Sequence, residues 1–329
     1  MTSTLIKFDG ISKDFKVVKR QKGLAGAFKS LFKREITIKH ALSDVSFEIA
    51  EGDIVGYIGP NGAGKSTTIK IMSGILTPTS GHAEIAGFVP WKNRKEYVKN
   101  IGVVFGQRSQ LWWDVPVIDS FELLKTIYKI DDQTYNKNLE LLTNKLNLKE
   151  VLNVPLRQLS LGQKMKCEIA GSLLHSPKIL FLDEPTIGLD AVTKLAVRQF
   201  VKEINRDFGV TVILTTHDMS DIEALTNKII LIGKGKILFN GSFSEIKRKY
   251  GAEKTINVEF EKEYKDAKLD GYELINHDKN IATYKTADPN FHINDFIKTA
   301  SQKFLVKDLS ITSLNVEQIL AKLYKEFDL

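Results

Sequence analysis

The chain contains, at residues 59–67, the stretch Gly59-Pro60-Asn61-Gly62-Ala63-Gly64-Lys65-Ser66-Thr67, which fits the P-loop pattern G-x-x-x-x-G-K-[ST]. An apolar run of strand length, 53–58, precedes the loop, and residues 68–73 after it have a helical pattern. The order predicts a strand, a glycine-rich loop and a helix whose N–H groups bind phosphate oxygens. Lys65 is expected to reach the terminal phosphates of a nucleoside triphosphate, and the Ser66 hydroxyl to bind Mg²⁺.

The composition is that of a chain that buries a hydrophobic core. The 329 residues are 43% hydrophobic and 26% charged, and the single cysteine, Cys167, excludes an internal disulfide and favours a reducing compartment. Cys167 lies in a helical pattern, where we expect it to be packed rather than reactive. No basic-then-apolar signal segment opens the sequence, and no apolar run is long enough to cross a bilayer. These features predict a soluble, cytosolic protein.

Strand and helix patterns alternate over residues 1–250 and change character over 251–329. The alternation predicts an α/β domain with a mostly parallel sheet, and the shorter second part predicts a small α+β domain without a catalytic motif. For that second part we favour a packing or dimerisation module. The first part is expected to contain strands at 5–8, 11–18, 45–49, 53–58, 82–86, 101–105, 178–182, 210–215, 228–232 and 236–239, and helices at 120–128, 136–146, 162–174 and 191–208.

A basic segment at residues 16–40 carries the whole net charge of the chain. It has eight Lys or Arg residues and one acid, Glu35, while the chain as a whole has a formal charge of +7. Leu24, Phe28 and Leu31 recur within it at helical spacing. A short basic amphipathic helix can bind an anionic membrane surface. The alternative is a solvated elbow packed on the domain or a partner, and the local charge does not predict nucleic-acid binding.

Two adjacent carboxylates follow the apolar strand at 178–182. Asp183 would hold Mg²⁺, and Glu184 beside it would act as the general base that polarises the attacking water. Alone, this strand end is weak evidence. It is preceded, however, by Leu159-Ser160-Leu161-Gly162-Gln163.

With these motifs in order, residues 5–250 resemble the nucleotide-binding subunits of ATP-binding cassette (ABC) transporters. Gln107 matches the Q-loop glutamine, which the resemblance implies is a catalytic residue and a Mg²⁺ ligand. Residues 159–163 match the signature LSGGQ, in which Ser160, Gly162 and Gln163 would contact ATP. Asp190 matches the D-loop aspartate, and His217 the catalytic switch histidine. The resemblance therefore implies an α/β P-loop cassette that hydrolyses ATP with Mg²⁺.

The sequence departs from the family pattern at two positions. Leu161 stands where the signature has its first glycine, and Phe15 is the candidate for the aromatic residue that stacks on adenine, where the family has tyrosine. Phe15 could equally be an ordinary core residue. The aromatic segment at Trp112 and Trp113 has two interpretations, core packing or a contact surface for the permease.

The resemblance also implies partners. Two cassettes, expected to be a homodimer, would enclose two ATP molecules, with Lys65, Glu184 and His217 from one subunit and 160–163 from the other. A separate permease would place the protein on the cytoplasmic face of the membrane. The single cassette with its small tail resembles the exporter branch that has type-2 permeases, whose cargoes include drugs, lipids and glycans. The alternatives are an importer ATPase and, in another class, a soluble ABC ATPase acting on ribosomes or DNA. The soluble class is disfavoured because the chain has neither a second cassette nor a long coiled coil.

Overall fold

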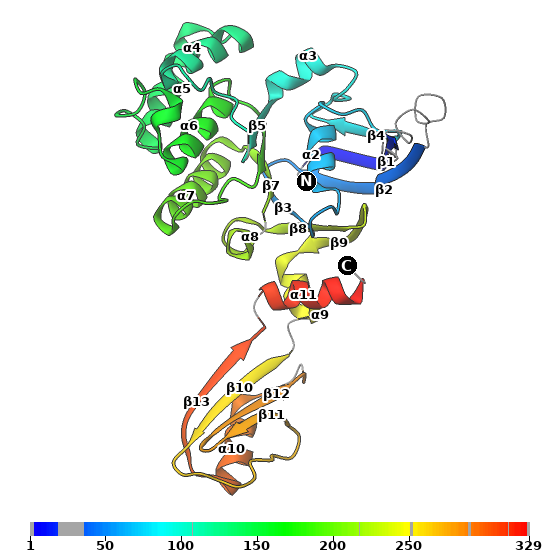
Figure 1. Ribbon diagram of the computed structural model, residues 1–329, viewed down its shortest axis with the longest axis vertical. Coiled ribbons are helices and arrows are strands. Elements are labelled where there is room, and N and C mark those ends of the chain that lie inside the picture. Colours follow the sequence, from blue (N-terminus) through cyan, green and yellow to red (C-terminus); the bar gives the residue numbers. More distant parts are fainter. Residues whose placement is uncertain are drawn as a thin grey trace, which may run out of the picture. The chain divides into compact units, whose positions relative to one another are not determined.

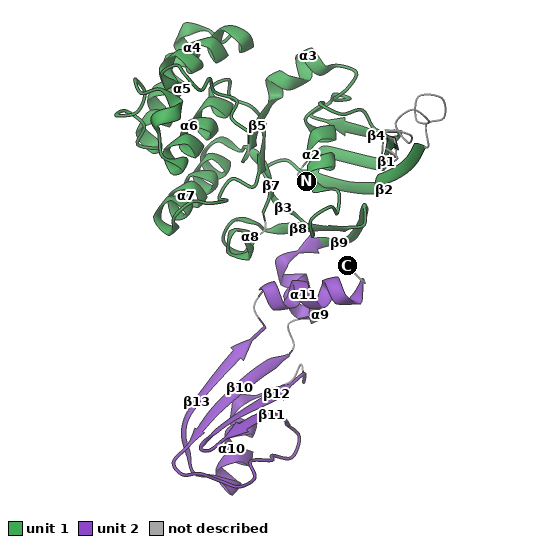
Figure 2. Cartoon of the chain, in the orientation of Figure 1, with its two compact units in different colours: residues 1–240 green, residues 241–329 purple. Residues whose placement is uncertain are grey.

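The structure is a computed structural model that describes residues 3–18, 36–106, 108–216, 218–250, 253–288, 291–314 and 316–327. Most of the basic segment, 19–35, lies outside these ranges, and so does the interpretation of it as a helix. The chain divides into two compact units, Met1–Asn240 and Gly241–Leu329, which Figure 2 shows in green and purple.

Unit 1 is built on a six-stranded sheet in the order β5-β6-β7-β3-β8-β9. The pairs β5–β6, β6–β7, β7–β3 and β3–β8 are parallel, and β3 and β7 are buried along their whole length. Continuous apolar strands are typical of parallel sheets covered on both faces. The strands are β3 (Ile54–Ile58), β5 (Ile101–Phe105), β6 (Ile179–Asp183), β7 (Thr211–Thr215), β8 (Lys228–Gly233) and β9 (Lys236–Ser242).

A second, antiparallel sheet has the order β2-β1-β4, with β1 (Thr4–Val18), β2 (Ile36–Ala50) and β4 (Ser80–Ile85). The sequence predicted two strands, 5–8 and 11–18, and that prediction is wrong because one strand continues through Gly10. The register of β1 on β2 shifts between Phe8 and Ile11, and Gly10 has a φ of 61°. A bulge at glycine bends a strand without ending it.

The described helices of unit 1 include five that the sequence predicted, α2 and α4 to α7, and two short ones that it did not. Figure 1 shows α4 to α7 together on one side of the long sheet, with the antiparallel sheet on the other. The unpredicted α3 and α8 each span two turns or less, too short for a periodic pattern to be recognised. The helices are α2 (Lys65–Met72), α3 (Arg94–Tyr97), α4 (Val117–Tyr128), α5 (Asp132–Lys145), α6 (Leu161–Leu173), α7 (Ala191–Phe208) and α8 (Met219–Leu225), with 3₁₀ turns at Val98–Asn100 and Leu156–Gln158.

Unit 2 is an α+β structure with its own core. Its sheet has the order β11-β12-β10-β13, and α10 covers one face through Phe296, whose ring lies 5.5 Å from that of Tyr284. The unpredicted α9 packs on α11. The elements are α9 (Phe243–Tyr250), β10 (Lys254–Phe260), β11 (Glu273–Asp278), β12 (Ile281–Thr286), α10 (Ile293–Lys303), β13 (Val306–Ser313) and α11 (Val316–Glu326).

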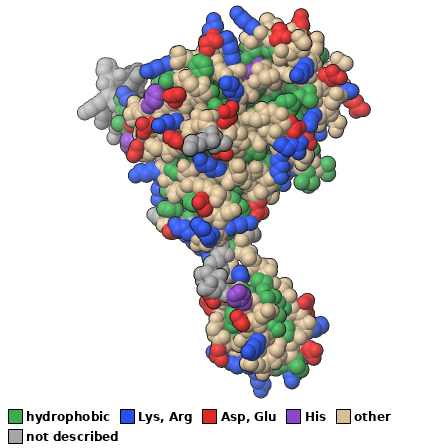
Figure 3. All heavy atoms as spheres, turned by 180° about the vertical axis from the view of Figure 1, so that it is seen from behind, with side chains coloured by type: hydrophobic (Ala, Val, Ile, Leu, Met, Phe, Trp, Pro, Cys, Tyr) green, Lys and Arg blue, Asp and Glu red, His purple; other side chains and the backbone are tan. Residues whose placement is uncertain are grey.

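The surface carries both charge signs. On the face drawn in Figure 3, Lys and Arg side chains are interspersed with Asp and Glu rather than gathered in one field. Among the described residues, no helix combines the length and the apolar character needed to cross a membrane. Cys167 is buried, and its burial raises the pKa of the thiol to about 12, so the predicted packing role is confirmed.

Candidate functional site

The predicted motifs meet at one edge of the parallel sheet. The P-loop follows β3, Asp183 ends β6, and Thr215 ends β7, while β6, β7 and β3 are consecutive neighbours. Asp183 is paired in register with Thr215. Because the strands are parallel, their carboxyl ends lie together, the position at which open α/β sheets bind ligands.

The P-loop is held close to its surroundings by glycine. Gly64 has a φ of 116°, and a Cβ added there would lie 2.7 Å from Leu42 Cδ2 and 2.9 Å from the Ala41 carbonyl oxygen. At Gly59, an added Cβ would lie 2.2 Å from the Ile232 carbonyl oxygen. Side chains at either position would therefore push the loop away from β2 or β8.

Lys65 lies inside this loop. It is 7% exposed, and its Nζ donates hydrogen bonds to the carbonyl oxygens of Gly59 (2.6 Å) and Pro60 (3.1 Å). Burial lowers the pKa of the ammonium, and the negative charges of Glu184 and Asp183 oppose that shift. The ammonium therefore lies within the field of both predicted carboxylates.

Three adjoining clefts share Glu184 in their walls. The largest, about 440 Å³, contains the P-loop and Phe15, so the candidate adenine-stacking residue lies beside the loop. The second, about 310 Å³, brings Ser66 together with Asp183, and the third, about 220 Å³, extends toward Thr186 and Asp218. The wall of the largest cleft consists of Phe15, Val17, Lys39, Ala41, Asn61, Gly62, Gly64, Lys65, Ser66, Thr67 and Glu184.

Asp183 and Glu184 are both held by Thr215 at the end of β7. Thr215 Oγ1 donates to Asp183 Oδ1 (2.6 Å), and the Glu184 N–H donates to the carbonyl oxygen of Thr215 (3.0 Å). Glu184 has a φ of 56°, a left-handed conformation that a residue with a side chain adopts only where its surroundings impose it. The backbone thus turns sharply directly after Asp183.

The residues of these clefts fit a magnesium nucleotide. Lys65, Ser66 and Thr67 form the first turn of α2, whose N–H groups have no acceptor within the helix, and that turn contains no acidic residue. Ser66 and Asp183 contribute hard oxygen atoms to one cleft, the ligands that Mg²⁺ prefers. The donor set therefore suits phosphate, and the oxygen set suits the cation.

The predicted signature residues lie elsewhere in the unit. Ser160 is the N-cap of α6, where its Oγ accepts from the Gln163 N–H (3.2 Å) and Gln163 Oε1 accepts from the Ser160 N–H (2.9 Å). An added Cβ at Gly162 would lie 2.7 Å from Thr193, whose N–H donates to the capping carboxylate of Asp190 (2.9 Å). None of these predicted residues lines the three clefts. The structure therefore separates the predicted site into a cleft set and an exposed set.

The two remaining predicted residues, Gln107 and His217, lie outside the described residues. Their neighbours are placed. The Gly106 N–H donates to the Asp183 carbonyl oxygen (2.7 Å), and an added Cβ at Gly106 would lie 2.5 Å from the carbonyl oxygen of Glu184. The segment that enters position 107 therefore runs directly beside the carboxylates.

A buried glutamate that the sequence analysis did not single out holds the segment after position 107. Glu168 of α6 is 6% exposed and accepts hydrogen bonds from Ser109 Oγ and from the N–H groups of Gln110 (3.1 Å) and Leu111 (3.4 Å). Burial raises the pKa of its carboxyl, and these hydrogen bonds oppose the rise. The sequence contained one signal for this role of Glu168: it is a charged residue between Cys167 and Ile169 on the buried face of a helix.

The comparisons with known proteins agree with this arrangement. A family model described as ABC transporter matches residues 42–187. An uncharacterized ABC transporter ATP-binding protein of Methanocaldococcus jannaschii is 32% identical over 64% of this chain and 75% of its own length. A protein of Escherichia coli named "Probable multidrug ABC transporter ATP-binding protein YbhF" is 35% identical over 63% of this chain and 35% of its own length. The chain spans 26% and 28% of two further relatives, A-family ABC transporters of Dictyostelium discoideum.

A solved structure gives the same result for the fold. The dimer of an ATP-binding cassette in a post-hydrolysis state, bound to ADP and Pi, has a TM-score of 0.60 and 26% identity, covering 72% of this chain and 98% of that chain. The predicted α/β P-loop cassette with a small C-terminal α+β domain is confirmed. Proteins of this kind bind and hydrolyse ATP. With the P-loop, the signature and the paired carboxylates in place, the chain belongs to the family of ABC transporter ATP-binding proteins.

Proposed function

We propose that this chain is the ATP-hydrolysing subunit that powers a separate membrane permease, and that the permease exports a drug, lipid or glycan. The observation that carries the hydrolytic part is the meeting of Lys65, Ser66, Asp183 and Glu184 in adjoining clefts at one sheet edge. The direction of transport is supported by two points, the small α+β unit that follows the cassette and the multidrug name of the Escherichia coli relative.

In this proposal the P-loop binds and orients the phosphates. The first-turn N–H groups of α2 donate to the phosphate oxygens, and the Lys65 ammonium leaves the carbonyl oxygens of Gly59 and Pro60 to do the same. Phe15, in the wall of the same cleft, would stack on the nucleobase. Mg²⁺, held by Ser66 and Asp183 with Gln107 as a further ligand, would neutralise charge on the phosphates.

Glu184 is the proposed general base, with Gln107 and His217 completing the catalytic set. Its carboxylate lines the P-loop cleft and the cleft that contains Asp183, so it can reach a water molecule beside the terminal phosphate. The hydrogen bond from its N–H to the Thr215 carbonyl oxygen fixes the residue on β7, and its left-handed backbone directs the chain away from β6.

The exposed set is proposed to meet the nucleotide of a second copy. Around Ser160 and Asp190 lie four exposed apolar side chains, Leu161 (48%), Ile187 (46%), Val192 (76%) and Leu195 (63%). A cluster of this kind, rimmed by polar groups, is typical of an interaction surface. A homodimer closed by ATP would cover it, with Ser160, Gly162, Gln163 and Asp190 completing the site of the partner.

A third surface suits the permease. Trp112 and Trp113 are 43% and 53% exposed, and Lys164 Nζ lies 4.4 Å from the centre of the Trp113 ring. Because exposed tryptophans are typical anchors of interfaces, the contact interpretation is favoured over core packing. This contact would hold the protein on the cytoplasmic face of the membrane, and the basic segment would add attraction to an anionic membrane surface. An importer ATPase would use the same contact surface.

Hydrolysis is tested with Glu184→Gln. We expect the purified chain to hydrolyse ATP only with Mg²⁺, and the variant to bind ATP while losing roughly 100-fold or more in kcat, within the usual range for a general base. ATP-dependent dimer formation, followed by light scattering, should increase because the bound nucleotide persists. Normal turnover by Glu184→Gln would exclude it as the base.

The transport role is tested by purification in detergent. A tagged chain is expected to retain a polytopic membrane protein, and Trp113→Ala to lose it while keeping its ATPase activity. Phe208→Ala is the matched control because Phe208 is an equally exposed aromatic residue (55%) at the end of α7. Retention of ribosomes or DNA in place of a membrane protein would favour the soluble class.

A further inference from the structure

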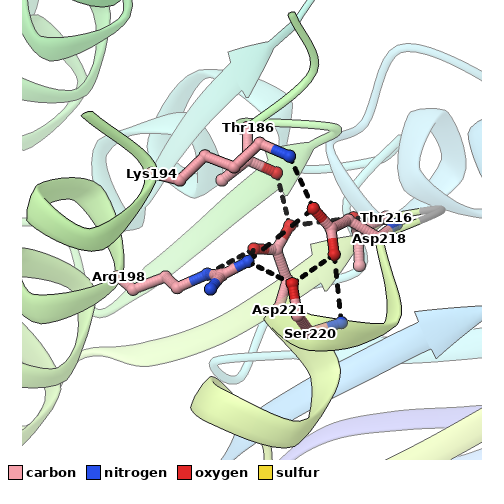
Figure 4. A network of polar contacts seen from close by, with 7 residues as sticks. All are labelled: Thr186, Lys194, Arg198, Thr216, Asp218, Ser220 and Asp221. Atoms are coloured by element: carbon pink, nitrogen blue, oxygen red, sulfur yellow. Dashed lines mark hydrogen bonds and ion pairs between the residues drawn. The ribbon is translucent and has the colours of Figure 1, made fainter. Parts of the chain in front are cut away.

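A group of seven side chains, here called the Asp221 cluster, is built around the carboxylate of Asp221 beside the third cleft. Asp221, in the first turn of α8, is completely buried. Its Oδ2 accepts hydrogen bonds from Thr186 Oγ1 and from Thr216 Oγ1 (3.0 Å). Figure 4 shows the cluster, whose members are Thr186, Lys194, Arg198, Thr216, Asp218, Ser220 and Asp221.

The charge of Asp221 is balanced from α7. Arg198 Nε lies 2.6 Å from Asp221 Oδ1, and the Arg198 side chain is only 13% exposed. A buried carboxylate is costly unless it is paired and its oxygens accept further hydrogen bonds, and here both conditions are met. This pair therefore holds α7 and α8 together at a defined distance.

The two threonines connect the pair to the catalytic end of the sheet. Thr186 lies two residues after Glu184, in a turn where the Ile187 N–H donates to the Glu184 carbonyl oxygen (3.3 Å). Thr216 directly follows Thr215, which binds the Asp183 carboxylate and the Glu184 N–H, and it directly precedes position 217. The Asp221 carboxylate thus holds two segments through these threonines. One is the turn after Glu184, and the other leads into position 217, that of the proposed switch histidine.

A second ion pair extends the cluster toward the exposed set. Lys194 Nζ lies 2.6 Å from Asp218 Oδ2, and Lys194 is in the first turn of α7, which Asp190 caps. Burial alone would raise the pKa of Asp218, but hydrogen bonds from Lys194 and Ser220 outweigh it and lower the pKa to about 2. Asp218 therefore stays ionised. Its ion pair with Lys194 connects the exposed end of α7 to the turn after Glu184 and to the segment around position 217.

We propose that Asp221 and Arg198 are positioning residues, which fix the left-handed Glu184 in place through Thr186 and link it to the exposed end of α7 through Thr216 and Asp218. The inference rests on the proposed ATPase function. A strained residue needs its surroundings to impose its conformation: Thr215 holds the N–H of Glu184 on one side, and the Thr186 hydrogen bond to Asp221 holds the following turn on the other. A second copy that docks on Asp190 and Val192 would then affect the position of Glu184 directly.

The test compares Thr186→Val with Thr186→Ser. Valine keeps the shape and removes the hydroxyl, whereas serine keeps the hydrogen bond to Asp221. We expect Thr186→Val to lower kcat by roughly 10- to 100-fold, as a small displacement of a catalytic group does, with the ATP dissociation constant within about twofold of the original. Thr186→Ser should restore most of the rate. Equal rates for the two variants, or a parallel loss of ATP binding, would overturn the proposal.

A second measurement needs no nucleotide. Hydrogen exchange of the Ile187 and Leu189 amides, which close the turn after Glu184, should accelerate in Thr186→Val and in Asp221→Asn. The matched control is Glu203→Gln, which removes another α7 ion pair (Lys145 Nζ, 2.6 Å) outside the cluster and should leave exchange and kcat unchanged. Unchanged exchange in Thr186→Val would overturn the positioning role. Failure of the unaltered chain to hydrolyse ATP would instead refute the proposed function, while the exchange result would still test the contact.

Discussion

Two regions of unit 1 are built in opposite ways: the P-loop cleft, and the surface around Ser160 and Asp190, here called the signature surface. In the cleft, Lys65 is 7% exposed and the loop is confined by backbone atoms of β2 and β8. At the signature surface, Ser160 and Asp190 cap helices, and beside them Val192 is 76% exposed. The cleft is walled by residues of one chain, whereas the surface exposes apolar side chains beside its two helix caps. Under the proposed function, nucleotide binding depends on internal packing, and turnover depends on association with a second copy.

The largest effect is expected from a substitution at Gly64, which should disrupt the internal packing of the cleft. Gly64→Ala would place a Cβ against Leu42 and the Ala41 carbonyl oxygen at a φ of 116°, so the loop must move. We expect ATP binding, measured by calorimetry, to be lost, and the free energy of unfolding to fall by about 1–3 kcal/mol.

Gly62 supplies a control within the same loop. It also has a positive φ, 82°, but an added Cβ there would meet nothing within 4 Å. Gly62→Ala should therefore show only the backbone cost, about 1 kcal/mol, and retain measurable ATP binding. Equal behaviour of the two variants would show that contact with β2 does not shape the cleft.

Much of the cleft could be predicted because its residues form contiguous motifs. The P-loop is nine consecutive residues, and Asp183 with Glu184 directly ends an apolar strand. Each motif binds through local backbone geometry, which a short sequence specifies. The parallel sheet followed from the alternation of strand and helix patterns.

What the sequence could not reveal is the support behind these residues. Asp221 interacts with Thr186, Thr216 and Arg198, which come from three separate segments. No spacing rule links them, because their proximity depends on the packing of α7 and α8 around β7. Similarly, the strand prediction stopped at Gly10, since a bulge and a turn have the same local residues.

The next largest effect is expected at the signature surface. Val192→Asp, introduced together with Glu184→Gln, would bury an unpaired charge if a second copy docks there. We expect ATP-dependent dimerisation, measured by sedimentation, to weaken by roughly 100-fold or more. ATP binding by the monomer should persist, since Val192 lies outside the clefts.

An exposed isoleucine of unit 2 controls for the added charge. Ile275 is 53% exposed on β11, and Ile275→Asp should leave the ATP-dependent dimer intact if the cassette surface is the interface. Loss of the dimer in this variant alone would assign association to unit 2, which would then be a dimerisation module.

The smallest effect concerns the anchored end of α6, opposite its exposed N-cap. His175, two residues beyond the helix, stacks on Tyr128 at 3.9 Å, and its Nε2–H donates to the Ile101 carbonyl oxygen (2.9 Å). Burial lowers the pKa of the imidazole from 6.5 to about 4, although the hydrogen bond to Ile101 opposes the shift. The folded chain therefore keeps His175 neutral at pH values where the unfolded chain protonates it.

The resulting stability is fully present above pH 6.5 and is lost as the pH falls through about 4, by up to roughly 3 kcal/mol. Urea unfolding of the original chain and of His175→Phe between these pH values isolates the contribution, because phenylalanine keeps the stack on Tyr128 and does not titrate. We expect the difference in unfolding free energy between them to shrink as the pH falls, while ATP affinity at neutral pH stays the same. A constant difference would mean that the imidazole is accessible to protons in the folded chain.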